Sequence, residues 1–161
     1  MPFQNTPHEV LLRQGRVIDP SQGLDQICDV RFLNGVVAEI ELNLAAGVDA
    51  DVRNVMGMIV TPGLIDLHTH VYWGGTSIGV DPIALARQSA TATLVHAGTS
   101  GAGNLLGFRK HVIEPSAPLR ILPLLNISFP GIFAFSRTVR MGECEDLRLL
   151  DMNSCISVAR E

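Results

Sequence analysis

Two histidines separated by one residue, His68 and His70, are the side chains in this 161-residue sequence whose type and spacing best suit metal chemistry. Alternate residues of a β-strand share a face, and two residues span ~6.6–6.8 Å of backbone. Two imidazoles at that spacing can lean toward one ion at a nitrogen–zinc distance of ~2.0–2.1 Å. A solvent-facing strand edge can carry the same pair, so the surrounding residues must decide between a metal site and an ordinary surface.

The residues that lead into the pair favour a metal site. Residues 61–63 read Thr-Pro-Gly, which is turn chemistry because Pro fixes φ and Gly accepts a positive φ. The apolar run 64–67, interrupted only by Asp66, suits a strand that is covered on both faces. We therefore expect a buried strand whose end presents His68 and His70.

The elements after His70 are expected to alternate between helix and strand. Asp81 followed by Pro82 is typical of a helix start, and that helix should run to about Ser89. The other expected elements are a strand over 91–97, a helix over 105–113, a strand over 119–127 with an irregularity at Pro123, and a helix from Asp151 to 160. Such alternation predicts parallel strands with right-handed crossovers, and about three βα units over residues 61–161.

Residues 1–60 have a different pattern and are expected to form a separate, small antiparallel β layer. Short strands are predicted over 10–12, 16–19, 27–33, 36–41 and 52–55, with turns between them, including one at Gly15. Asn34-Gly35 between two of these strands predicts a hairpin with a type I′ turn.

Polar residues at the other strand ends are further candidates, because the active site of a parallel barrel lies at the carboxyl ends of its strands. His96 ends the second predicted strand and Asn126 the third. If Leu94 and His96 face inward, His96 could be a third metal ligand, a group that orients a ligand, or a substrate contact; a hydrogen-bonded structural histidine is an equally good interpretation. Tyr72 either lines a substrate pocket or packs beneath it.

The whole string PGLIDLHTH at residues 62–70 resembles the first barrel strand of the amidohydrolase superfamily of metal-dependent hydrolases. The resemblance implies the first strands and helices of a TIM-type (β/α)8 barrel, preceded by a small antiparallel β-sandwich portion. It also implies that His68 and His70 bind the more buried of two divalent ions, usually zinc. In this family metal-activated water is the nucleophile, and an aspartate on the last barrel strand shuttles the proton. At the position of His96, relatives tend to carry an aspartate.

The sequence is short for such an enzyme. A closed barrel of this type takes ~250 residues, so the resemblance implies an incomplete barrel and the N-terminal portion of a larger enzyme. The family also uses a carboxylated lysine on strand four, histidines on strands five and six, and the late aspartate. The single lysine, Lys110, falls within a predicted helix. The later ligands and the catalytic base are therefore expected beyond the chain.

Residues after the pair narrow the resemblance to one branch. Dihydroorotases usually place an arginine where this chain has Tyr72, whereas residues 98–104, 108–116 and 145–148 look like the dihydroorotase-like deacetylases. That branch hydrolyses N-acyl amides or acetyl esters of small carboxylic acids. The expected function is thus metal-dependent hydrolysis of an amide or ester bond of a small carboxylic acid derivative. Two alternatives stay open: a non-catalytic truncated fragment, and a dihydroorotase-type cyclic amide hydrolase.

Composition limits the partners and the compartment. Hydrophobic residues make up 47% of the chain and charged residues 17%, which leaves homo-oligomerisation open, and the net charge of −4 without a basic cluster argues against nucleic acid. The expected partner is a small-molecule substrate. No apolar stretch reaches ~18 residues, and no basic segment followed by an apolar one opens the chain, so neither a membrane span nor a secretory signal is expected. The three widely spaced cysteines fit a reducing cytoplasm.

Overall fold

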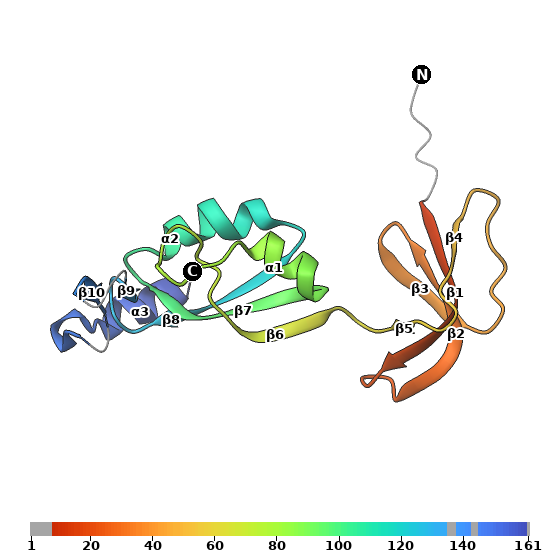
Figure 1. Cartoon of the computed structure of the whole chain (residues 1–161), viewed down its shortest axis with the longest axis horizontal. Helices are drawn as coiled ribbons and strands as arrows, with labels where there is room; N and C mark the ends of the chain where they lie inside the picture. Colours follow the sequence, from red (N-terminus) through yellow and green to blue (C-terminus); the bar gives the residue numbers. More distant parts are fainter. Residues whose placement is uncertain (1–7, 135–137, 143–144, 161) are drawn as a thin grey trace, which may run out of the picture. The chain divides into compact units, whose positions relative to one another are not determined.

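The computed structural model describes residues 8–134, 138–142 and 145–160. Cys144, which the sequence suggests is an apolar residue rather than a nucleophile, lies outside the described residues. The chain forms two compact units, Met1–Pro62 and Gly63–Glu161 (Figure 1). In the described part of the chain, no helix combines the length and the apolar character needed to cross a membrane.

The first unit is built on a five-stranded sheet with the order β3-β2-β1-β4, in which β5 also pairs with β1. Its strands are β1 (Glu9–Asp19), β2 (Leu24–Leu33), β3 (Val36–Glu41), β4 (Asp51–Asn54) and β5 (Ile59–Val60). β1 and β2 pair antiparallel, as do β2 and β3, but β4 and β5 both pair parallel to β1. The prediction of an antiparallel layer is therefore wrong for β4 and β5. The segment between β3 and β4 crosses to the other side of β1, and the chain then runs parallel to β1 through both strands.

Local turn chemistry explains two features of this sheet. Asn34 and Gly35 have φ values of 53° and 82°, so the predicted hairpin with two positive-φ residues is confirmed. The predicted turn at Gly15 is wrong: β1 continues through it as a bulge, with Gln14 at φ 62° and a register shift between Leu12 and Gly15. The Asp29 carboxylate supports the bulge by accepting a hydrogen bond from the Gln14 N–H at 2.9 Å.

The second unit contains a parallel sheet with the order β6-β7-β8, and helices α1 and α2 lie over one face of it (Figure 1). Its elements are β6 (Leu64–Thr69), α1 (Pro82–Ser89), β7 (Thr91–Gly101), α2 (Leu105–Phe108) continued by a π-helical turn (Arg109–Ile113) and a 3-10 turn (Glu114–Ser116), β8 (Arg120–Asn126), β9 (Phe133–Ala134), β10 (Arg140–Met141), a 3-10 turn (Leu147–Leu149) and α3 (Met152–Ala159). The predicted alternation of strands and helices is confirmed, and α1 has the bounds expected from the sequence.

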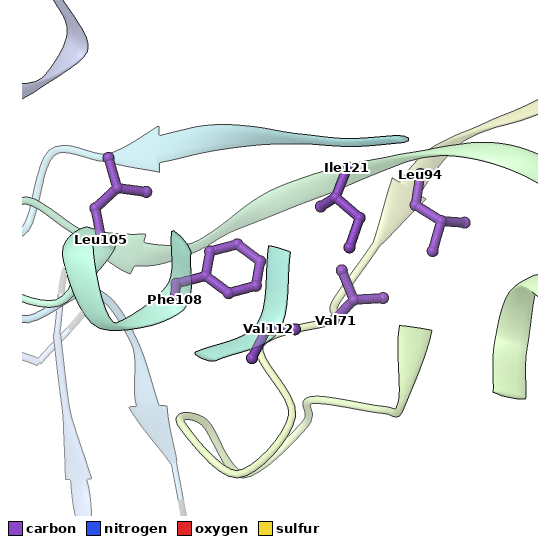
Figure 2. Packing of buried hydrophobic residues seen from close by; sticks show 6 residues of the cluster. All are labelled: Val71, Leu94, Leu105, Phe108, Val112 and Ile121. Carbon is purple, nitrogen blue, oxygen red and sulfur yellow. The ribbon is translucent and has the colours of Figure 1, made fainter. Parts of the chain in front are cut away.

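The core of the second unit lies between the sheet and the helices (Figure 2). Its buried members are Val71, Leu94, Leu105, Phe108, Val112 and Ile121. Figure 2 shows Phe108 on the helical segment between Leu105 and Val112, with side chains of β7 and β8 facing it. Because Leu94 and Ile121 are register partners on adjacent strands, their side chains cover the helix-facing side of the sheet together.

The start of α1 illustrates how a local signal fixes an element. The Asp81 carboxylate accepts hydrogen bonds from the backbone N–H groups of Ile83 at 2.8 Å and Ala84 at 3.1 Å. These two donors have no partner inside the helix, so the cap satisfies them.

Replacing Asp81 with alanine should lower the free energy of unfolding of this unit by about 1 kcal/mol, because the two capped N–H groups lose their acceptor. Urea unfolding followed by the fluorescence of Trp73, the single tryptophan, measures the change in this unit. Asp81→Asn keeps an acceptor oxygen and should retain most of the stability. Equal losses in the two variants would contradict the capping role.

Two predictions about the strands of this sheet are wrong. In the described residues β6 pairs with β7 alone, and Leu64, Ile65 and Leu67 are 51%, 60% and 74% exposed, so β6 is an edge strand rather than one covered on both faces. Pro123 also causes no irregularity, since β7 and β8 pair without a break from Thr93 to Ala97. β8 has β7 as its neighbour on one side, so the proline nitrogen can face the free edge.

Candidate metal centre

His68 and His70 come together at the carboxyl end of β6. Their ring centroids are 5.2 Å apart in an edge-to-face arrangement. The Asp66 carboxylate accepts a hydrogen bond from the His68 N–H at 3.0 Å, and a register shift between Asp66 and Thr69 interrupts the pairing of β6 with β7. Thr69 turns away from the pair and donates its hydroxyl to the Val95 carbonyl at 2.9 Å. The strand end is thus anchored to β7 between the two histidines.

The two histidines differ in their surroundings. His68 is exposed, whereas His70 is partly buried and its Nδ1 atom is buried without a hydrogen-bond partner. Burial, and to a lesser degree the neighbouring His68, lowers the pKa of His70. A neutral imidazole is the form that binds a metal, so the environment favours the state that a ligand needs.

His96 lies next to the pair and belongs to the core. It is fully buried, its ring centroid is 6.1 Å from that of His70, and it packs against Phe108 with a centroid distance of 4.5 Å. Nδ1 accepts a hydrogen bond from the Val71 N–H at 3.1 Å, and Nε2 lies 2.8 Å from the Thr99 hydroxyl oxygen. Both ring nitrogens of His96 thus have protein partners and its ring has no exposed surface, an environment that suits the structural interpretation. Its assignment as a ligand or substrate contact stays a prediction.

We assign the tautomer of His96 from the shorter of its two contacts with backbone N–H groups. Because Nδ1 accepts from the Val71 N–H, the proton of the neutral ring is on Nε2 and is donated to the Thr99 hydroxyl. The longer contact of 3.3 Å from the Thr99 N–H to Nε2 would require the opposite tautomer. Burial, together with the neighbouring His70, lowers the pKa of His96 to about 4, so the ring is neutral at pH 7.

Tyr72 and Asn126, the other two candidates, both contact other residues of the second unit. Tyr72 stacks on Phe108 at a centroid distance of 4.6 Å, and its hydroxyl donates to the Asn104 carbonyl at 3.4 Å. Asn126 is buried; its amide donates to the Gly98 carbonyl at 2.7 Å and its side-chain oxygen accepts from the Ser128 N–H at 2.8 Å. Tyr72 therefore packs on Phe108, and Asn126 ties the end of β8 to Gly98 in β7. Their roles toward a substrate stay predictions.

The surroundings of the pair contain no complete ligand set. Among the described residues, no group of three or more His, Cys, Asp or Glu side chains is arranged to hold a metal ion. The sequence interpretation also missed two residues that organise this region, Thr99 and Phe108, which both contact His96. For the contact between Thr99 and His96, the short separation of the two residues along the chain is a signal that the sequence offers. For the contact between Phe108 and His96, the sequence offers no such signal.

Comparison with known proteins shows which enzymes the chain resembles. No family model matches the chain. A crystal structure of a dihydroorotase superimposes with a TM-score of 0.78 at 29% identity, covering 94% of this chain and 39% of that one. A deacetylase of Agrobacterium fabrum, Atu3266, is 34% identical over 122 residues, which is 76% of this chain and 30% of the relative. A dihydroorotase of Geobacter sulfurreducens is 43% identical over 81 residues, which is 50% of this chain and 19% of the relative.

The chain is thus similar to hydrolases in both fold and sequence. The resemblance to the amidohydrolase superfamily, with the deacetylases and dihydroorotases as the relatives, is confirmed. The chain spans less than a third of the length of these curated relatives.

Proposed function

We propose that this chain contributes the first metal-binding residues of a hydrolase that cleaves an amide or ester bond of a small carboxylic acid derivative, as a deacetylase does. The observation that supports this most is the edge-to-face pair of His68 and His70 at the end of a parallel strand, in a chain that is 34% identical to a deacetylase over 122 residues. We also propose that the complete enzyme has a (β/α)8 barrel and a β-sandwich and that it is located in the cytoplasm.

The residues present fit a divalent ion in part. His68 and His70 would hold it, since their rings are adjacent and the buried Nδ1 of His70 has no protein partner. Imidazole nitrogen suits zinc, and the complete enzyme would hold two such ions. A bound divalent ion lowers the pKa of water to about 7 and polarises a carbonyl oxygen.

The remaining parts of the site are assigned to the portion of the relatives that this chain does not match. A catalytic zinc typically has three protein ligands and an open position. His68 and His70 supply two, so we assign the others and the catalytic base to that unmatched portion. The 161 residues alone are accordingly proposed to bind metal without turning over substrate.

A dihydroorotase-type cyclic amide hydrolase is the second candidate. It is favoured by the higher identity, 43%, to the Geobacter dihydroorotase, over a shorter segment. Tyr72 counts against it, because it stands where dihydroorotases usually carry an arginine and is stacked on Phe108.

The metal proposal predicts that the purified chain retains zinc and that His68→Ala removes it, because a single remaining imidazole binds zinc weakly. Zinc content after desalting, measured by inductively coupled plasma mass spectrometry, tests this. His111→Ala is the matched control, since His111 is an exposed histidine of the π-helical turn and should leave the zinc content unchanged. Equal zinc in the wild type and His68→Ala, or none in the wild type, would contradict the assignment.

A further inference from the structure

We propose that His96 is a positioning residue for the candidate metal centre: by accepting the Val71 N–H it fixes the backbone that leaves His70, and so holds the histidine pair in its edge-to-face arrangement. This inference rests on the proposed function, because it concerns the same pair.

The contact is placed where it can control His70. Val71 directly follows His70, and β6 ends at Thr69, so this segment lies beyond the strand pairing. The His70 carbonyl accepts the Val80 N–H at 2.9 Å, which holds the segment to the chain before α1. The 3.1 Å bond from the Val71 N–H to Nδ1 of His96 ties the same segment to β7. Val71 itself is fully buried in the core. A rotation of the His70 backbone would therefore break the hydrogen bond or move Val71 out of the core.

The ring of His96 is itself held in a defined orientation. Nε2 donates to the Thr99 hydroxyl at 2.8 Å, and the ring lies against Phe108. Its position is thus fixed by two further contacts besides the one to the His70 segment. Groups behind a metal ligand that are held in this way commonly set the orientation of that ligand.

Asparagine and leucine separate positioning from packing. In the His96→Asn variant, the side-chain oxygen is bonded to Cγ, as Nδ1 is in histidine. The variant therefore keeps an acceptor for the Val71 N–H but loses the volume of the ring. His96→Leu keeps apolar volume near Phe108 but removes the acceptor. If His96 acts by positioning, His96→Asn should keep the metal affinity better than His96→Leu. If His96 acts by packing alone, His96→Leu should keep it better.

Two measurements on the full 161-residue chain test the proposal. Hydrogen exchange of the Val71 amide, followed by NMR, should remain slow in His96→Asn and become fast in His96→Leu. Titration with Co²⁺, followed by the ring signals of His68 and His70, should show affinity weakened by about tenfold or more in His96→Leu and largely kept in His96→Asn. His111→Leu, which replaces an exposed histidine, should match the wild type in both.

The outcomes distinguish this inference from the proposed function. If the wild type binds no Co²⁺ but Val71 exchange depends on His96 as expected, the metal assignment fails and the positioning of the segment stands. If Co²⁺ binds equally to the wild type and His96→Leu, or if His96→Leu binds better than His96→Asn, the positioning role is overturned while the metal site stands. Val71 exchange that is equally slow in all variants also overturns it.

Discussion

Phe108→Ala should lower the free energy of unfolding of the second unit by about 3–5 kcal/mol, the usual cost of removing a buried aromatic ring. Phe108 is fully buried and central to the core in Figure 2. Its ring stacks on Tyr72 at 4.6 Å and contacts His96 at 4.5 Å, so the cavity would open beside both side chains. The loss adds a cavity term to the lost burial of the ring.

Urea unfolding followed by Trp73 fluorescence measures this change, because Trp73 lies in the same unit. Leu106→Ala is the matched control: Leu106 lies in the same helix but is 63% exposed, so its truncation should cost little. Phe108→Leu should fall between the two. Comparable losses for Phe108→Ala and Leu106→Ala would contradict the central place of Phe108 in the core.

Acidification should destabilise the same unit through His96. The pKa of His96 is lowered to about 4 by burial and by His70, against 6.5 for a histidine in water. Between these values the unfolded chain binds a proton that the folded chain does not accept. The stability is therefore complete above pH 6.5 and is lost as the pH falls toward about 4, with the loss reaching about 2–3 kcal/mol.

The pH prediction is checked by measuring urea unfolding near neutral pH and in mild acid for the wild type and for His96→Asn. The variant cannot titrate at this position, so its loss on acidification should be smaller than that of the wild type. His70, whose pKa is also lowered by burial, contributes in the same direction in both proteins and cancels in the comparison. An identical acid sensitivity in the two proteins would show that His96 does not carry the effect.

The sequence predicted the elements that depend on local chemistry. Helix α1 follows from Asp81-Pro82, and the hairpin follows from Asn34-Gly35; both lie where expected because the capping and φ requirements are satisfied within a few residues. The closeness of His68 and His70 was likewise expected from their spacing.

Features that depend on distant contacts were not predictable in this way. The parallel pairing of β4 with β1 and the bulge at Gln14 depend on Asp29 and on the path between strands, which no local pattern specifies. The role of His96 was left open because a strand residue can face either side of its sheet. Its contacts with Thr99 and Phe108 determine the side that it faces.

The exposed edge of β6 has a consequence for handling the protein. An edge strand offers unpaired backbone N–H and C=O groups, and here they are flanked by the exposed side chains of Leu64, Ile65 and Leu67. Such an edge is a template onto which a strand from another molecule can add. Concentrated samples of these 161 residues will consequently tend toward intermolecular β-association, with the histidine pair carried at the end of the very strand that nucleates it.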